Sequence, residues 1–160
     1  MSAAVVIKVQ AFDEAALAPY ARVIKPPAAA GERRFYSDAL HDRPALAAPV
    51  FHVNHVPPAQ LPLQATLLER HPHAAQCFVP LDVSRYLAVV MPSGADGAPL
   101  VDQAVAMHMP GNLGIIYLRG VWHLGAHVLD RTGHFSVLMW RGGQEPDDEF
   151  RTVPPFILQE

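Results

Sequence analysis

The sequence predicts an all-β fold of short strands with one or two short helices, and three observations lead to this prediction. Proline accounts for 16 of the 160 residues, about twice its usual share, and proline interrupts helices and central strands. Apolar residues recur in short runs that Pro and Gly corners separate, as in sandwiches and jelly-roll barrels. Hydrophobic residues make up 51% of the chain and charged residues 17%, a composition that favours a packed core over disorder.

Length and charge limit the classes of protein that fit. The 160 residues fit a single domain, 1–160, and no linker or internal repeat divides them. A formal net charge of −3 offers no attraction to nucleic acid or to an anionic membrane surface, so neither is an expected partner.

The cellular compartment is indicated by two features. The chain holds one cysteine, Cys77, so an intrachain disulfide is excluded. The apolar run at the amino end is short and is interrupted at Lys8, unlike a signal peptide, and no run approaches the roughly 18 apolar residues of a membrane helix. We therefore expect a cytoplasmic protein.

The first elements follow from alternation and from capping residues. Residues 4–9 are rich in Val and Ile and predict a strand. A short helix is expected next, because Asp13 can cap its amino end and Pro19 stops it. The chain is expected to be extended again over 20–24, and a short strand is expected at 33–36.

The run 49–56 alternates and predicts a strand with two different faces. One face carries Phe51, Val53 and His55, and the other carries His52, Asn54 and Val56. Later apolar runs between turn residues complete a set of about ten strands, as expected for a jelly roll. These runs are 65–70, 76–80, 86–91, 105–109, 113–118, 126–129 and 135–140. The Pro-rich tail 144–160 is expected to pack over the barrel or over a partner chain.

A first cluster of reactive side chains lies at 69–78, ERHPHAAQCF. His71 and His73 are two residues apart, so an extended chain would point both to one side. Such a pair aimed into a barrel is typical of a small metal site, because neutral imidazole binds Zn, Fe, Ni, Cu or Mn. Glu69 is a candidate ligand or general base, with an ion pair to a neighbouring arginine as the alternative.

A second cluster lies at 117–123, YLRGVWH. Gly120 permits a corner, and His123 follows three residues later. This spacing after an apolar strand is typical of the second half of a cupin site, and its distance of about fifty residues from the first cluster suits two halves of one jelly-roll barrel. The predicted fold is therefore a cupin double-stranded β-helix.

Other polar residues have simpler interpretations. Arg119 and Arg141 are candidates for clamping a carboxylate, with surface charges as the alternative. Cys77 is expected to be a small core residue. The remaining histidines considered, His52, His55, His108 and His134, are each expected to be hydrogen-bonded core residues rather than ligands.

Three segments together resemble the ureidoglycolate lyase family. They are ERHPHAAQCFVP at 69–80, YLRGVWH at 117–123 and WRGG at 140–143. The resemblance covers nearly the whole chain in the right order. It implies a cupin fold, a homodimer, and cleavage of a small carboxylate, (S)-ureidoglycolate, to glyoxylate and urea in allantoin and purine breakdown.

Positions carried over by the resemblance define an expected pocket. The expected catalytic residues are His123, Glu69 and His71, with His123 as base and Glu69 or His71 as acid. The expected substrate-binding residues are Arg119, Arg141, Gln76, Tyr117 and Trp122. A divalent ion such as Mn, Ni, Zn or Fe would be held by His71, Gln76 and His123, with His73 as a further ligand; the alternative is a metal-free site in which Gln76 donates a hydrogen bond.

Four residues depart from the family pattern. Ile116 stands where the family has Asn, Leu124 where it has His, Gly125 where it has Pro, and Trp140 where it has Asp. Three of these exchanges replace a polar group by an apolar one. They motivate two alternatives: a metal-dependent cupin enzyme acting on a more apolar small carboxylate, and a non-catalytic ligand-binding cupin.

Overall fold

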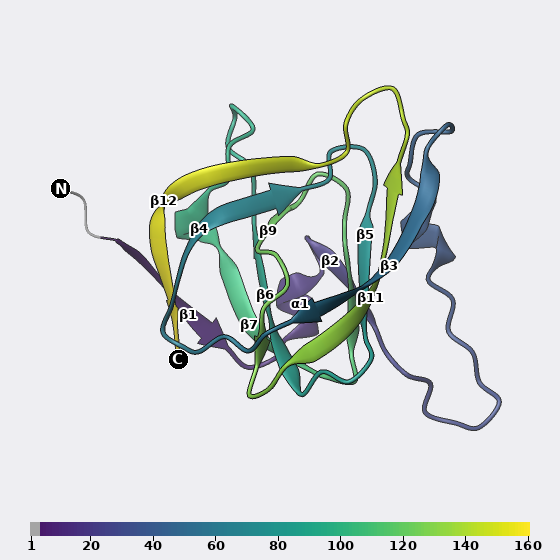
Figure 1. Cartoon of the computed structure of the whole chain (residues 1–160), viewed down its shortest axis with the longest axis horizontal. Coiled ribbons are helices and arrows are strands. Elements are labelled where there is room, and N and C mark those ends of the chain that lie inside the picture. The colour runs from purple at the N-terminus through teal and green to yellow at the C-terminus, as the bar shows by residue number, and fades with distance from the viewer. Residues whose placement is uncertain (1–3) are drawn as a thin grey trace.

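The computed structural model describes residues 4–160, which form a cupin-like barrel of β-strands (Figure 1). The all-β fold with a single short α-helix is confirmed within this range. The strands are β1 (Val5–Gln10), β2 (Ala21–Ile24), β3 (Ala48–Val56), β4 (Leu63–Arg70), β5 (Gln76–Pro80), β6 (Arg85–Met91), β7 (Val105–Pro110), β8 (Gly114–Tyr117), β9 (Trp122–His123), β10 (Val128–Leu129), β11 (Gly133–Arg141) and β12 (Glu149–Gln159). The helices are α1 (Glu14–Leu17) and two 3-10 turns, η1 (Ser37–Leu40) and η2 (Val101–Gln103).

The strands form two sheets. One has the order β10-β6-β7-β1-β12-β4-β9, and an additional pairing of β9 with β6 closes six of its strands into a small barrel. The other is a five-stranded sheet of order β2-β8-β5-β11-β3. Figure 1 shows β12 and β4 on one side of the interior and β3 and β11 on the other. We refer below to the six-stranded barrel and to the five-stranded sheet.

Strand β6 separates two hydrophobic cores. Tyr86, Ala88 and Val90 pack with residues of the five-stranded sheet, such as Phe135. The alternate residues Leu87, Val89 and Met91 pack inside the six-stranded barrel. The sequence is apolar on both faces of this strand because both faces are buried.

Two sequence predictions need correction. Residues 33–36 form no strand. The tail predicted to lie over the barrel is instead a long strand, β12, which pairs with β4 and, in parallel, with β1. Its two prolines are tolerated because the register with β4 shifts between Thr152 and Phe156, and a bulge does not need the missing N–H groups.

The helix and the edge strand match the sequence closely. Asp13 caps α1, its Oδ1 accepting hydrogen bonds from the N–H groups of Ala15 (3.0 Å) and Ala16 (3.4 Å). Within the described part of the chain, strand β3 pairs only with β11 and forms an edge of the five-stranded sheet. Its Phe51 and Val53 are exposed, whereas the opposite face, with His52 and Asn54, lines a pocket.

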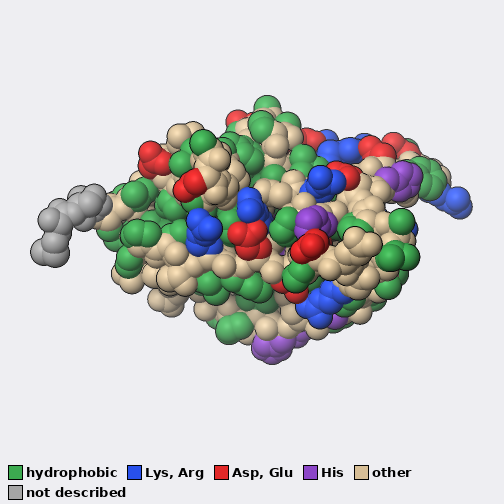
Figure 2. All heavy atoms as spheres, turned by 90° about the horizontal axis from the view of Figure 1, so that it is seen from above, with side chains coloured by type: hydrophobic (Ala, Val, Ile, Leu, Met, Phe, Trp, Pro, Cys, Tyr) green, Lys and Arg blue, Asp and Glu red, His purple; other side chains and the backbone are tan. Residues whose placement is uncertain are grey.

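The surface carries charges of both signs, as the small net charge of the sequence leads us to expect. Acidic and basic side chains are intermixed on the face seen in Figure 2. None of the helices described between residues 4 and 160 has the length and apolar character needed to span a membrane.

We expect Phe156→Ala to lower the free energy of unfolding by about 3–5 kcal/mol, because it would empty a fully buried site. The matched control is Phe51→Ala, which removes a ring that is 70% exposed and should change stability by less than about 0.5 kcal/mol. Urea unfolding of both variants measures this. Similar losses in the two variants would show that β12 does not belong to the core.

Candidate active site

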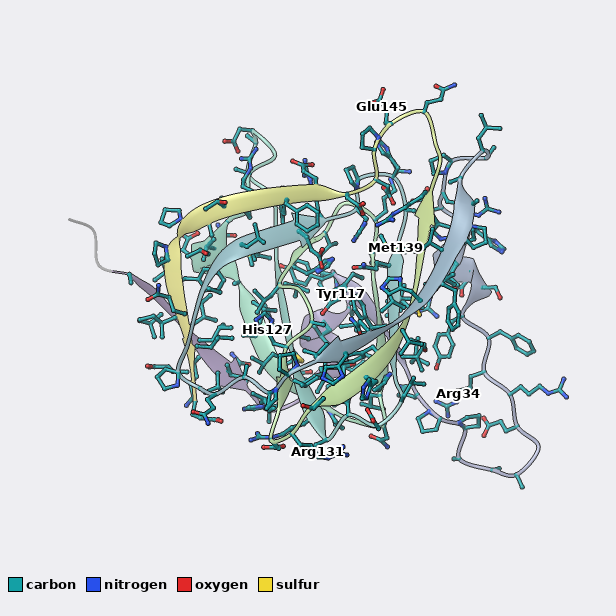
Figure 3. The ribbon with its side chains drawn as sticks, in the orientation of Figure 1. Arg34, Tyr117, His127, Arg131, Met139 and Glu145 are labelled. Atoms are coloured by element: carbon teal, nitrogen blue, oxygen red, sulfur yellow. The ribbon has the colours of Figure 1, made fainter. Side chains whose placement is uncertain are left out.

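A pocket of about 330 Å³ lies between the six-stranded barrel and the five-stranded sheet, a size that suits a small molecule. The first predicted cluster lines it through Glu69, His71, Gln76 and Phe78, and His123 of the second cluster lies next to Glu69 and His71. Its lining residues are His52, Asn54, Glu69, His71, Gln76, Phe78, Ala126, Val137, Met139, Arg141, Asp148 and Phe150. Tyr117 lies in the interior beside it (Figure 3), with its ring stacked on that of His123 at 3.9 Å between centroids.

The two clusters meet through backbone pairing. Strand β9 pairs with β4 and places His123 directly opposite Glu69. The preceding corner is held at Gly120, whose φ of 76° is left-handed and whose N–H donates to the carbonyl of His71 at 2.8 Å. A residue without Cβ adopts this conformation at little cost. As a result, candidate ligand atoms of Glu69, His71 and His123 all lie within 4.8 Å of one another.

Both imidazoles are oriented by backbone carbonyls. The Nδ1 atom of His71 lies 2.7 Å from the carbonyl oxygen of Asp147, and Nδ1 of His123 lies 3.3 Å from that of Leu124. Because a carbonyl only accepts, we assign the proton of each neutral ring to Nδ1. Each Nε2 then carries a lone pair, and both Nε2 atoms are buried without a hydrogen-bond partner, as is Oε1 of Gln76.

Burial controls the protonation of the cluster. Burial, followed by the charge of the nearby His71, lowers the pKa of His123 to about 3, so His123 is neutral at ordinary pH. Burial also raises the pKa of the Glu69 carboxyl; His71 opposes this effect and Asp148 adds to it. Burial, followed by the charge of Glu69, raises the pKa of the Tyr117 phenol well above its usual value.

The donor set fits a divalent metal ion. Two imidazole lone pairs, a carboxylate and an amide oxygen suit Mn, Fe, Ni or Zn, and three of these donors are buried without another partner. His71 and His123 would be the main ligands, with Glu69 beside them and Gln76 as a weaker one. Glu69, a candidate ligand or general base from the sequence, lies with His71 and His123 in this cluster.

His73 does not join this set. Its backbone N–H donates to Oδ1 of Asp147 at 2.7 Å, and the residue lines a different hollow beside Leu46 and Glu145. The bend at Pro72 breaks the extended geometry on which the prediction for His73 depended.

The structure separates the expected substrate-binding residues. Arg141 lines the pocket; its side chain is 60% exposed, and it lies 3.4 Å from Asp148. Arg119 does not line it, since its guanidinium lies at the surface and pairs with Asp42 at 2.7 Å. Trp122 packs inside the six-stranded barrel and donates from Nε1 to the carbonyl of Gly97 at 2.9 Å. Adjacent residues of a strand face opposite sides, so Trp122 and His123 cannot share the pocket.

Sequence reasoning missed four residues that line or support the pocket. Alternation placed His52 and Asn54 on one face of β3 but could not show that this face is the inner one. Asp148 lines the mouth, and Asp147 supports His71 through its backbone carbonyl, which no side-chain pattern reveals.

Three of the four departures from the family pattern point away from the pocket. Ile116 packs with Ala75 and Cys77 on the outer face of the five-stranded sheet. Leu124 lies inside the six-stranded barrel, and Trp140 packs with Ala47 and Ala74. Only Gly125 approaches the cluster, because a Cβ at this position would lie 3.7 Å from Oε1 of Glu69.

We expect His71→Asn to lower the affinity of the protein for Mn²⁺ at least about tenfold, because it removes a ligand whose orientation is fixed. His73→Asn is the matched control, two residues away and outside the cluster, and should leave the affinity unchanged. Isothermal titration of the EDTA-treated proteins measures both. Equal affinities for wild type and His71→Asn would contradict the assignment of His71 as a ligand.

Comparisons with known proteins relate the chain to a family. A family model described as ureidoglycolate lyase matches residues 4–158. The chain is 35% identical to ureidoglycolate lyase of Burkholderia cepacia over 159 residues, which cover 92% of this chain and 86% of that protein. It is also 35% identical over 91 residues to ureidoglycolate lyase of Stutzerimonas stutzeri (strain A1501), with 57% and 52% covered.

A solved structure of RmlC from Streptococcus suis in complex with dTDP-D-xylose superposes with a TM-score of 0.43 and 13% identity, covering 84% of this chain and 56% of that one. That superposition is too loose to say more about this chain. The family match and the Burkholderia cepacia relative, in contrast, cover nearly all of it, so the chain belongs to the ureidoglycolate lyase family.

Proposed function

We propose that the protein is a ureidoglycolate lyase that converts (S)-ureidoglycolate to glyoxylate and urea. One observation carries the proposal: in a chain of this family, Glu69, His71 and His123 converge beside a pocket that Glu69, His71 and Arg141 line. The relatives reported above bear the same activity in their names.

The reaction defines what the pocket must supply. Ureidoglycolate is a carbinolamine that carries a carboxylate. The hydroxyl loses its proton, its oxygen electrons form the aldehyde C=O, the C–N bond breaks, and the urea nitrogen takes up a proton. No water is consumed. The pocket therefore needs a cation for the carboxylate, an acceptor for the hydroxyl proton and a donor for the leaving nitrogen.

Arg141 supplies the cation. It is the arginine among the pocket-lining residues, and a guanidinium binds a carboxylate with two parallel hydrogen bonds. Arg141 lies 3.4 Å from Asp148 and would exchange this partner for the carboxylate of the substrate. Arg119, already paired with Asp42 at the surface, is not needed for this role.

His123 and Glu69 supply the proton acceptor and donor. The neutral His123 presents a lone pair at Nε2, and its low pKa makes it a weak base until the substrate hydroxyl is polarised. A divalent ion held by His71, His123 and Glu69 would polarise the hydroxyl as a Lewis acid, but His123 and Glu69 would then be ligands and could not transfer protons. The proton-transfer roles of these two residues therefore apply to the metal-free site. The raised pKa of Glu69 favours its protonated form, which suits donation to the leaving nitrogen.

The alternative of a more apolar substrate loses its motivation. It rested on Ile116, Leu124 and Trp140, and these side chains pack outside the pocket. A non-catalytic binding protein is distinguished from an enzyme by turnover.

We further propose a cytoplasmic homodimer. The family resemblance supports the homodimer, and the single cysteine of the sequence supports the cytoplasm.

The purified protein should release urea from racemic ureidoglycolate above the uncatalysed background and stop when half of the racemate is consumed. His123→Ala should lower kcat by roughly 10²–10⁴-fold, the usual contribution of a positioned proton-transfer group. His73→Ala is the control and should retain wild-type turnover. Release no faster than background from the wild-type protein would exclude this substrate.

Arg141→Ala should raise KM for ureidoglycolate about 10–100-fold, because a charge-assisted hydrogen bond contributes roughly 1.5–3 kcal/mol. Arg119→Ala removes the same charge outside the pocket and should leave KM unchanged. Steady-state kinetics of the two variants separates them. A larger effect of Arg119→Ala would transfer the carboxylate-binding role to that residue.

A further inference from the structure

We propose that His55 and His134, supported by Asp82, form a second divalent-metal site, on the surface and apart from the catalytic pocket. A pair of imidazoles selects first-row transition ions at the strong end of the affinity series, such as Ni²⁺, Cu²⁺ or Zn²⁺. The site does not depend on the proposed lyase function.

The backbone holds the two histidines opposite each other. His134 of β11 pairs directly with His55 of β3 in an antiparallel ladder that runs from Gly133↔Val56 to Arg141↔Ala48. Directly opposed residues of neighbouring strands project to the same face. The long ladder fixes the separation of the two Cα atoms, so the pair is set by the fold and not by flexible loops.

The distance between the two nitrogens is close to the distance between two nitrogens that bind the same metal ion. Nε2 of His134 lies 3.1 Å from Nδ1 of His55, with the ring planes at 86°. Two imidazole nitrogens bound at about 2.0–2.1 Å to one ion are about 2.9 Å apart at a right angle and about 3.4 Å apart at the tetrahedral angle. A modest rotation of the rings about χ2 would direct both lone pairs to a shared ion.

Asp82 orients His134 for this role. Its Oδ2 accepts from Nδ1 of His134 at 2.9 Å, and its Oδ1 accepts from the backbone N–H of His134 at 2.7 Å. A carboxylate on the far nitrogen of a ligating histidine is the usual support of such ligands. It fixes the tautomer, so Nε2 of His134 carries the lone pair that faces His55.

Binding requires only one proton to move. Without an ion, the Nδ1–H of His55 donates to Nε2 of His134. An ion takes the place of that proton, which moves through solvent to Nε2 of His55. The side chains of His134 and Asp82 are 37% and 49% exposed, so the ion and its remaining water ligands have access.

An ion at this place would fasten the edge of the sheet. Among residues 4–160, strand β3 pairs only with β11. Asn54, next to His55, lines the pocket and accepts at Oδ1 from the N–H of Phe135, next to His134, at 3.2 Å. A bridge between His55 and His134 therefore clamps the strand that carries Asn54 and His52.

The test is Ni²⁺ binding by isothermal titration to EDTA-treated wild type and to three variants, His55→Asn, His134→Asn and Asp82→Asn. Wild type should bind one equivalent more than either histidine variant. Asp82→Asn should keep the stoichiometry and lose about 10–100-fold in affinity. His41→Asn, which alters an exposed histidine in the loop after η1, is the matched control and should bind as wild type does. Unchanged stoichiometry and affinity in both histidine variants would overturn the proposal.

A second measurement, of the Tm, tests whether an ion between His55 and His134 stabilises the fold. Ni²⁺ should raise the Tm of wild type more than that of His134→Asn, because an ion that binds only the folded state stabilises it by mass action. An equal rise in the two proteins would refute a stabilising ion at this place. Neither measurement uses turnover, and the equivalent lost in His71→Asn is a different one, so failure here leaves the proposed lyase function untouched.

Discussion

The pairing of the two-residue strand β9 with both β4 and β6 is the constraint on which the rest of the structure depends. It closes the six-stranded barrel and brings together chain segments about fifty residues apart. Trp122 thereby enters the hydrophobic interior, while His123, the next residue, lies directly opposite Glu69 in the pairing of β9 with β4. The pairing of one short strand, β9, thus determines both the packing of the barrel and the assembly of the reactive cluster.

Burial then decides the chemical state of that cluster. The Nδ1 atoms of His71 and His123 lie beside backbone carbonyls, which assigns the proton of each neutral ring to Nδ1. The lone pair of each ring is then at its buried Nε2 atom. The same low-polarity surroundings keep His123 neutral and favour a protonated Glu69. The pocket therefore contains a proton acceptor and a proton donor side by side, or a set of ligands for one ion, without a change of geometry.

Much of this could be predicted from the sequence, because Pro and Gly corners mark the strand ends and because the motif around Glu69 lies on one strand and bend. The strand β12 was missed since its prolines lie at a bulge that only its pairing with β4 reveals. The family resemblance places Arg119 and Trp122 in the pocket, but Arg119 pairs with Asp42 at the surface and Trp122 packs inside the six-stranded barrel. Asp147 was not predictable, since it acts through its backbone.

The position of β1 has a consequence for folding. This strand lies between β7 and β12 and pairs in parallel with both, so Val5 lies beside Phe156. The six-stranded barrel cannot close until the chain has been synthesised through β12, and in the interval β1 and β4 each lack a neighbour. Contacts between residues so distant in sequence slow folding and expose unpaired strand edges. A nascent chain of this protein therefore exposes these unpaired strand edges to aggregation until β12 has been synthesised.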